Sequence, residues 1–433
     1  MIKSGYATFA TSTLTSFNSD LSNLVESKGM FERSSLTIFN TALPSLVDGK
    51  SMFKNSKLSD FYTKLGSLVY GGEMFSTTSE LKSFENDLSN LVDGTEMFYA
   101  SSIASFVSDL SNLVDGTGMF KGSSLKTFKG DLSSLVLGSY MFSGSDIEMF
   151  DNNLGNLSSA AAMFSSTPLI SFNWDMGKLV NGYQMFASTS LTSFNGDLSS
   201  LVNGEDMFKD CSNLTSFIGD LNSLIDGQNM FYNTSLDVDS VEMICDVLPN
   251  WKENKIMTYN WDVNEGKYIE TEWNGSSNLS YKCLQSSAHF TLENNIQYLP
   301  TKFAKNMTIY WSNIAILTEA ERKTVLDLMV ETANEKDWTF ITNTQIDSDG
   351  KVSPTQVMAA DGTVQRYIYV IKTEADEKTA KFVDADGKYW NVHTAECIIG
   401  PNVKYWELFA TKEDAITAWG LSEYTYVEPT EEA

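Results

Sequence analysis

Cysteine and histidine are scarce in this 433-residue chain, which contains four cysteines and two histidines. Cys211, Cys245, Cys283 and Cys397 are widely spaced and form no CxxC pair, so we expect free, mostly buried thiols rather than a disulfide framework. With so few sulfur and imidazole ligands, a zinc site is not expected. We predict no metal and no cofactor, and the cysteines do not reveal the redox compartment.

Long apolar runs and basic residues are also in short supply. The N-terminal sequence MIKSGYATFATSTLTSF lacks the apolar segment of a signal peptide, and no run of about 20 apolar residues predicts membrane insertion. Lys and Arg number 30 against 56 Asp and Glu, a net charge of −26. Such a surface repels phosphates and anionic lipids, which argues against nucleic-acid binding and against membrane binding through a basic patch.

Familiar catalytic motifs are missing as well. No GxSxG, Walker A, GxGxxG or HExxH sequence is present, and His289 and His393 lie in separate strand-like runs where we expect structural or surface roles. The segments 347–350 and 384–387 lack the Gly and Glu spacing of an EF-hand and are interpreted as hairpin turns. We therefore predict no enzyme and no catalytic residues, although a glycosidase carboxylate pair within residues 263–433 stays an alternative.

What the chain does contain is a repeat of 22 or 23 residues marked by a Met-Phe pair. The first residues of these pairs, after a degenerate Thr8-Phe9 copy, are Met30, Met52, Met74, Met97, Met119, Met141, Met163, Met185, Met207 and Met230. Apart from that dipeptide, the unit MFASTSLTSFNGDLSSLVNG has its apolar residues at Leu191, Phe194, Leu198, Leu201 and Val202. One unit is too small to fold alone, so stacked copies are expected to share one core.

Each unit suggests two local structures. The LxxF segment predicts a short strand that pairs in parallel with its neighbours. The DLSSLV segment predicts a helical turn that is capped by Asp or Ser and ended by a recurring glycine. That glycine recurs at Gly49, Gly71, Gly94, Gly116, Gly138, Gly182, Gly204 and Gly227. The predicted fold class is an α/β repeat solenoid of about eleven coils, leucine-rich-repeat-like, with a C-terminal α+β module.

The stretch LTSFNGDLSSLVNGEDMFKDCSNLTSF (residues 191–217) resembles BspA-type leucine-rich repeats, and the resemblance covers about residues 5–262. Such arrays occur in bacterial surface proteins and in virion proteins of gut phages, so the resemblance implies recognition of host surface glycans or proteins. The chain departs from the family pattern because only Cys211 occupies the usual cysteine position.

We expect residues 1–262 to form the solenoid with a C-terminal helix-strand cap. In that helix Asp239 is the predicted N-cap with Glu242 at the third helical position, and the strand KIMTYNW follows. No N-terminal cap is visible, so we expect either that another virion or surface protein covers this end or that the chain is a piece of a longer array.

Three further segments follow. Residues 263–343 are interpreted as a strand and helix extension and as a candidate divergent continuation of the stack, with a capping box between Thr318 and Glu321. Residues 344–425 predict a small α+β module with hairpins and a final helix capped by Thr411. Residues 426–433 predict a disordered acidic tail.

Two sets of side chains are candidates for binding. A regular ladder of carboxylates stands three residues after the strand Phe, and we favour turn capping over cation or sugar binding. Its members are Asp20, Asp87, Asp109, Asp131, Asp175, Asp197 and Asp220. The strand segment itself predicts an exposed strip in which Tyr62, Asn173, Trp174 and Asn195 stand out, because an exposed Trp can stack on a sugar or anchor a partner.

These observations lead to a hypothesis of a non-enzymatic recognition or structural protein, virion-associated or extracellular, such as a phage tail or fibre component. A bacterial cell-surface adhesin of the same repeat family is an alternative, which would predict an export signal or anchor.

Overall fold

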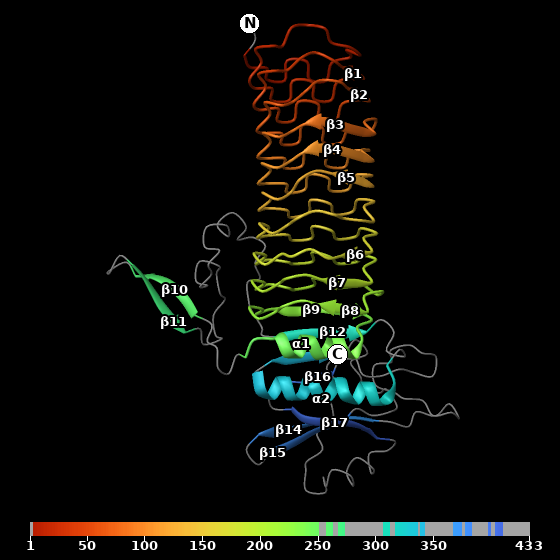
Figure 1. Ribbon diagram of the computed structural model, residues 1–433, viewed down its shortest axis with the longest axis vertical. Coiled ribbons are helices and arrows are strands. Elements are labelled where there is room, and N and C mark those ends of the chain that lie inside the picture. Colours follow the sequence, from red (N-terminus) through yellow and green to blue (C-terminus); the bar gives the residue numbers. More distant parts are fainter. Residues whose placement is uncertain are drawn as a thin grey trace, which may run out of the picture.

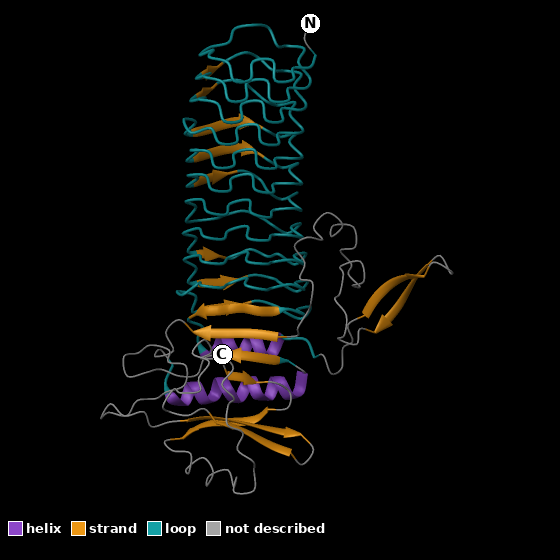
Figure 2. Cartoon of the chain, turned by 180° about the vertical axis from the view of Figure 1, so that it is seen from behind, coloured by secondary structure: helices purple, strands orange, loops and turns teal. Residues whose placement is uncertain are grey.

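The computed structural model describes residues 3–250, 257–262, 267–272, 306–311, 317–336, 338–342, 367–374, 377–382, 397–399 and 403–409. The repeats form a parallel β-solenoid, a rod with the N-terminus at one end and the helices at the other (Figures 1 and 2). Eight LxxF segments form short strands: β1 (Ile38–Phe39), β2 (Asp60–Phe61), β3 (Ser83–Asp87), β4 (Ser105–Asp109), β5 (Thr127–Lys129), β6 (Ser171–Phe172), β7 (Ser193–Asn195) and β8 (Ser216–Ile218). They pair in parallel as β1-β2, β3-β4-β5 and β6-β7-β8, with each strand Phe opposite the next.

A second parallel ladder runs along another side of the rod. Isolated bridges join eleven equivalent positions from Ser4 to Asp226, each separated by 22 or 23 residues. The Met-Phe segments make a third ladder of consecutive β-turns, in which Phe53 N–H donates to the Met74 carbonyl at 2.9 Å. Two residues of each such segment, for example Ser51 and Asn55, have φ near +55°. Positive φ at the third residue of a turn is the type II geometry.

The predicted helical turn in the DLSSLV segment is wrong. No helix lies within residues 3–237; instead Leu46 N–H donates to the Leu43 carbonyl at 3.2 Å in a single β-turn. The N–H groups of Val47 and Asp48 then donate to the Val25 carbonyl of the preceding coil at 2.9 and 3.0 Å. Because these groups bond between coils, they are not available for the i→i−4 bonds of a helix.

Two columns of phenylalanine rings fill the core of the rod. One column comes from the Met-Phe pairs and the other from the strands, and within each column the rings stack in parallel. Phe98 and Phe120 in the first column are 5.5 Å apart, and Phe84 and Phe106 in the second are 5.7 Å apart. Rings of different columns meet edge to face, as Phe106 and Phe120 do at 4.9 Å. Both geometries are favourable for aromatic pairs.

The recurring glycine has a packing role rather than the predicted helix-ending role. A Cβ atom on Gly49, Gly116 or Gly204 would lie 2.9–3.0 Å from the sulfur of the methionine in the following repeat. None of these glycines has a positive φ. Glycine is therefore needed here because the methionine of the next coil occupies the space of a side chain.

The C-terminal end of the rod is covered by a mixed layer. After β9 (Gly227–Thr234) comes α1 (Val238–Val247), and then β12 (Asn306–Trp311) pairs in parallel with β9. Next, α2 (Glu319–Lys336) packs on α1, and β13 (Thr339–Thr342) and β16 (Cys397–Ile399) extend the sheet in the order β16-β13-β12-β9. The last coil of the rod therefore continues into a sheet covered by helices.

The N-cap of α1 is Asp237, whose side chain accepts from Ser240 N–H at 2.9 Å, and not Asp239 as predicted. The capping box of α2 is present, since Thr318 N–H donates to Glu321 Oε2 at 2.7 Å and Glu321 N–H to Thr318 Oγ1 at 3.3 Å. Lys336 Nζ reaches the carbonyls of Cys245, Asp246 and Leu248, which joins the end of α2 to the end of α1.

The remaining strands form two smaller sheets. The strand expected in KIMTYNW is β10 (Met257–Asp262), but it pairs with β11 (Lys267–Glu272) in an antiparallel hairpin away from the rod (Figure 1). A second sheet has the order β15-β14-β17, from β14 (Tyr367–Glu374), β15 (Glu377–Phe382) and β17 (Val403–Phe409).

Several predictions fall outside the described residues. They concern Cys283, His289, His393, the turns at 347–350 and 384–387, the helix after Thr411, and the tail 426–433. Of the cysteines, Cys211 and Cys245 are buried and free, as expected for these two.

Candidate functional site

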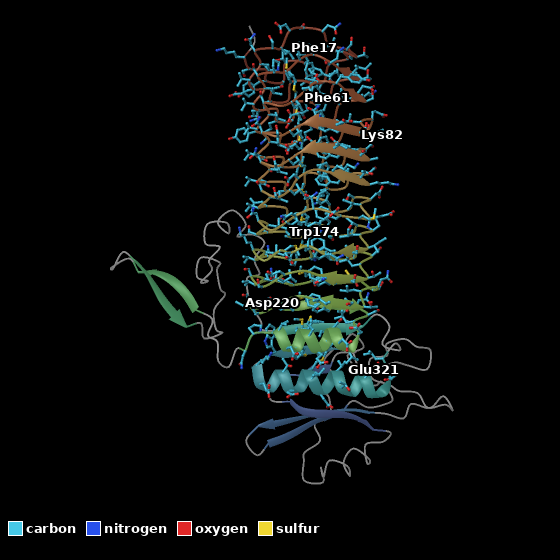
Figure 3. All side chains as sticks on the ribbon, viewed as in Figure 1. Phe17, Phe61, Lys82, Trp174, Asp220 and Glu321 are labelled. Carbon is cyan, nitrogen blue, oxygen red and sulfur yellow. The ribbon has the colours of Figure 1, made fainter. Side chains whose placement is uncertain are left out.

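The strand face is the side of the rod formed by the two residues before and the one residue after each strand Phe. Its exposed members differ from coil to coil, and Lys82 projects at the outer edge of the rod (Figure 3). Tyr62 is 70% exposed, and its hydroxyl donates to Asp60 Oδ1 at 3.2 Å. This hydrogen bond to a carboxylate raises the pKa of Tyr62. Met149, at 80% exposed, is the most exposed large apolar side chain of the described residues.

Trp174 follows the strand face by one residue and is half-buried, packed against the core. In other coils a polar side chain at this position donates to the carbonyl of the preceding coil. Asn86 donates to Thr63 at 2.7 Å, and Asn152 donates to Gly130 at 2.6 Å. Trp174 replaces such a donor with apolar contact, while its neighbour Asn173 is exposed.

The aspartate ladder caps turns. In six of its seven members one carboxylate oxygen accepts from the N–H two residues later; Asp131 and Asp197, for example, accept from Ser133 and Ser199 at 2.8 Å. Asn153 makes the same bond to Gly155 at 2.8 Å. Asp175 is the exception and accepts from Asp197 N–H of the next coil at 3.3 Å. The preferred interpretation as turn capping is therefore confirmed for six of the seven.

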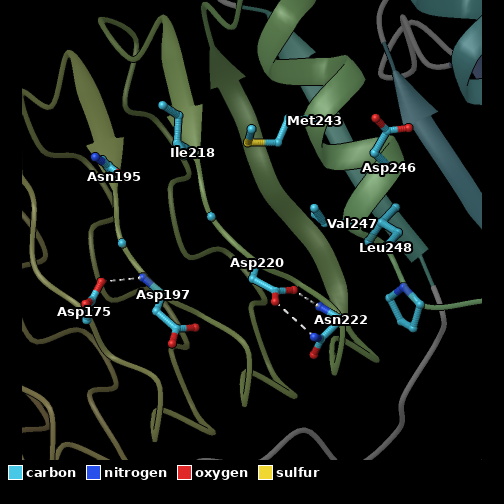
Figure 4. A pocket seen from close by; sticks show the side chains of 13 residues that line it. Asp175, Asn195, Asp197, Ile218, Asp220, Asn222, Met243, Asp246, Val247 and Leu248 are labelled. Carbon is cyan, nitrogen blue, oxygen red and sulfur yellow. Dashed lines mark hydrogen bonds between the residues drawn. The ribbon is translucent and has the colours of Figure 1, made fainter.

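A surface pocket of about 640 Å³ lies where the last coils meet α1 (Figure 4). The turn ladder contributes Asp175, Asp197 and Asp220 on one side, and α1 contributes Met243, Asp246 and Val247 on the other (Figure 4). The lining residues are Asp175, Asn195, Gly196, Asp197, Ile218, Gly219, Asp220, Asn222, Met243, Asp246, Val247, Leu248 and Pro249. The pocket thus combines hydrogen-bond acceptors with an apolar wall.

Two glycines help to form this pocket. Gly196 and Gly219 occupy the position at which Asn86 and Asn152 reach back to the preceding coil. Without such a side chain at Gly219, the Gly196 carbonyl has no donor among the described residues. The pocket therefore adds an unused backbone acceptor to its carboxylates.

The structure brings only part of the predicted binding set together. Asn195 lines the pocket, and Asn173 and Trp174 belong to the adjacent coil. Tyr62 lies on the same face, five coils before Asn173. The contribution of α1, through Met243 and Asp246, was missed. The available signal was two successive glycines at a position that carries a polar or bulky side chain in the other coils except that of Gly130.

A second group of acidic residues lies at the last rung of the bridge ladder. Asp226 is 2% exposed, and burial, opposed by a hydrogen bond from Gln228, raises its pKa to about 6. Burial also raises the pKa of Glu205, with Asp226 and Asp206 adding repulsion. In the two preceding coils the position of Asp226 holds Asn181 and Asn203, and Asn203 Nδ2 donates to Asn181 Oδ1 at 3.1 Å.

We predict that Asp226→Asn stabilises the protein at neutral pH. The carboxyl loses its proton near pH 6 in the folded state but near pH 4 in the unfolded state, so the ionised form opposes folding. The free energy of unfolding therefore falls as the pH rises from about 4 to about 6, by roughly 2 to 3 kcal/mol in total. The measurement is the free energy of unfolding of both proteins between these pH values, at constant ionic strength.

Asp48→Asn is the control for this prediction, because Asp48 occupies the same ladder position but is only half-buried. A stability difference between Asp226→Asn and the parent chain that does not change with pH would contradict the role of the buried charge.

Together, fold and site define a parallel β-solenoid repeat protein with a surface pocket at the C-terminal end of the rod. Comparison with protein-family models, with curated proteins and with solved structures gives no match. Among the described residues, no group of three His, Cys, Asp or Glu side chains could hold a metal ion. None of the helices in the described segments has both the length and the apolar character needed to cross a membrane.

Proposed function

We propose that the chain is a non-enzymatic recognition or structural protein of the BspA-like repeat class, displayed on a virion or cell surface. In this proposal the strand face contacts a host glycan or protein. A bacterial adhesin would use the same face. The two hypotheses differ in whether the rod is attached to a virion or to a bacterial cell, and they predict the same binding surface.

Two repeat positions support the proposal, because one is constant and buried and the other is variable and largely exposed. Every Met-Phe segment from Met30 to Phe231 keeps both side chains fully buried. The residue after the strand Phe, by comparison, changes in charge, size and polarity along the rod. In chain order from Tyr62 it is Tyr62, Glu85, Val107, Lys129, Asp151, Asn173, Asn195 and Ile218. A constant scaffold that displays varied exposed side chains is typical of recognition surfaces in solenoids.

Binding of the purified chain to a glycan array and to intact host cells tests the proposal. Tyr62→Ala and Asn173→Ala should each weaken binding by about tenfold if the strand face makes the contact, since exposed aromatic and amide groups are typical anchors. Trp174 is less suitable as a test because its packing against the core also stabilises the fold.

Tyr70→Ala is the matched control. Tyr70 is 49% exposed, but it lies on the bridge ladder rather than on the strand face. Equal loss of binding in Tyr62→Ala and Tyr70→Ala would count against the strand face. The absence of binding to every glycan and every host cell tested would reject the proposal itself.

The glycan-hydrolysis alternative concerns residues 263–433, most of which lie outside the described segments. No contact among the described residues favours it.

A further inference from the structure

The strand ladder of the rod is interrupted at two places, one between β2 and β3 and one after β5 (Figure 1). Among the described residues, no backbone hydrogen bond joins segment 58–63 to segment 81–86, or segment 125–130 to segment 147–152. Every other pair of successive strand segments in residues 14–219 shares at least one such bond. We call these two interruptions the first and the second seam.

The seams affect one side of the rod. The Met-Phe ladder continues past the second seam, where Phe120 N–H donates to the Met141 carbonyl at 2.8 Å, and past the first, where Phe53 makes the same bond at 2.9 Å. Rings of the Met-Phe column stay 5.3–5.6 Å apart along the whole rod.

The spacing of the strand column, by contrast, follows the hydrogen bonds. Its rings lie 5.5–5.9 Å apart where strands pair, but 6.1 Å apart across the first seam and 6.4 Å apart across the second. In the two intervals with a single backbone bond between the strand segments the distances are 6.3 and 6.2 Å. The coils therefore move apart on the strand side as backbone bonds are lost, while the Met-Phe side is unchanged.

Solvent reaches the core at both seams. Phe61 and Phe128, the rings that precede the two seams, are partly buried, whereas the other strand rings from Phe17 to Phe217 are buried. At the second seam the neighbouring Met149 is 80% exposed. A widening of about 0.5 Å already removes a substantial part of the dispersion attraction between stacked groups. The seams are therefore the places where adjacent coils are held least firmly on this face.

A half-buried asparagine bridges each seam. Asn86 Nδ2 donates to the Thr63 carbonyl at 2.7 Å, and its Oδ1 accepts from Leu65 N–H at 2.9 Å. Asn152 makes the same two bonds across the second seam, at 2.6 and 2.9 Å. In residues 14–219 no other coil has an asparagine at this position, two residues after the strand Phe. The bridging asparagines thus occur where the backbone bonds are missing.

We propose that the two seams are hinges at which the rod opens on its strand face while the Met-Phe ladder holds the coils together. Asn86 and Asn152 keep the hinges closed, and the seams divide the rod into three blocks. Because two side-chain hydrogen bonds replace a row of backbone bonds, a seam opens without unfolding the blocks on either side. Opening changes the distance between Tyr62 and the exposed residues of the next block whether or not this face binds a ligand, so the hinges do not depend on the proposed function.

Hydrogen exchange in the full chain, resolved to single amides by mass spectrometry with electron-transfer fragmentation, tests the hinges. The N–H of the second Leu in each DLSSLV-type segment bonds to a carbonyl of its own coil, so its exchange reports separation of the coils. Leu135 and Leu157 lie beside the second seam, whereas the coils of Leu113 and Leu201 have paired strands on both sides. We expect the first two amides to exchange about tenfold or more faster than the other two.

Asn152→Ala removes the bridge and leaves the hydrogen bonds of Leu135 and Leu157 in place. Both amides should exchange faster by about a further tenfold, because no other hydrogen bond among the described residues joins segments 125–130 and 147–152. Phe120 N–H, in the Met-Phe ladder of the same coil, should keep its rate.

Ser108→Ala is the matched control. Ser108 occupies the same repeat position, and its Oγ donates to the Asn86 carbonyl at 3.0 Å, but it does so across the paired strands β3 and β4. The exchange of Leu113 should change by less than about twofold, because the backbone bonds of these strands remain.

Three results would overturn the proposal. The first is equal exchange of all four leucine amides in the parent chain, and the second is an equal effect of Asn152→Ala and Ser108→Ala. The third is faster exchange of Phe120 together with Leu135 in Asn152→Ala, because the whole coil would then unfold instead of opening on one side.

Discussion

Phe120→Ala is expected to lower the free energy of unfolding by about 3–5 kcal/mol, the usual cost of removing a buried ring. Phe120 is fully buried, lies near the middle of the Met-Phe ring column and also contacts rings of the strand column. It stacks on Phe98 at 5.5 Å and on Phe142 at 5.6 Å, and it meets Phe106 and Phe128 edge to face at 4.9 and 5.7 Å. The coils on both sides hold these neighbours in place, so the cavity cannot easily collapse.

Urea unfolding and amide hydrogen exchange measure this effect. Because each coil contacts only its neighbours, the loss of protection should be greatest in residues 97–142 and should decline toward both ends of the rod. Val107→Ala is the control, since Val107 is 36% exposed and its truncation should change stability by about 0.5 kcal/mol or less. A Phe120→Ala protein as stable as the Val107→Ala protein would show that the ring columns do not carry the core.

Gly116→Val is expected to destabilise the rod by about 3 kcal/mol, at the upper end of overpacking effects. A Cβ atom on Gly116 would lie 3.0 Å from Met141 Sδ and 3.2 Å from Leu135 Cδ1, and valine adds two further methyl groups. Gly116→Ala should cost less, because Ser27 and Ala160 occupy the same repeat position and are fully buried in their own coils.

Gly72→Val is the matched control, because the nearest atom to a Cβ on Gly72 is a carbonyl oxygen at an ordinary 3.7 Å. Met141→Ala should partly restore stability to Gly116→Val, since it removes the side chain that the new methyl groups meet. Thermal unfolding of the two single variants and of the double variant gives the coupling free energy, expected at about 1–3 kcal/mol. Strictly additive effects would contradict the proposed glycine–methionine contact.

Much of the fold can be predicted from particular residues. The Met-Phe pairs return every 22 or 23 residues, and identical units stacked in register must place identical side chains over one another. The parallel pairing of the LxxF segments and the burial of the Leu and Phe columns follow from this regularity. The turn-capping bonds of Asp131 and Asp197 follow as well, because an aspartate bonds to a backbone N–H two residues away without help from the rest of the fold.

The candidate site was less accessible to such reasoning. Asn195 was singled out because it follows a strand Phe, and it does line the pocket. Its companions Met243 and Asp246 lie on α1, about 50 residues further along the chain, and no local pattern links them to Asn195. The pattern Asp239 with Glu242 favoured the wrong N-cap, because Asp237 is the residue whose side chain accepts from Ser240 N–H in the folded chain.

The sequence by itself determined the period, the columns of buried residues and the parallel stacking, because all three depend only on the repetition of one short pattern. The tertiary structure decided which local conformation each coil adopts in the segment between its strands. A DLSSLV segment with a following glycine is compatible with a helical turn or with a β-turn, and the choice depends on where its N–H groups find acceptors. In the rod the acceptors of these N–H groups belong to the preceding coil, so no helix forms, and the glycine leaves space for the methionine of the following coil. The pocket also exists only in three dimensions, because its two walls come from segments that meet only when α1 folds against the last coils.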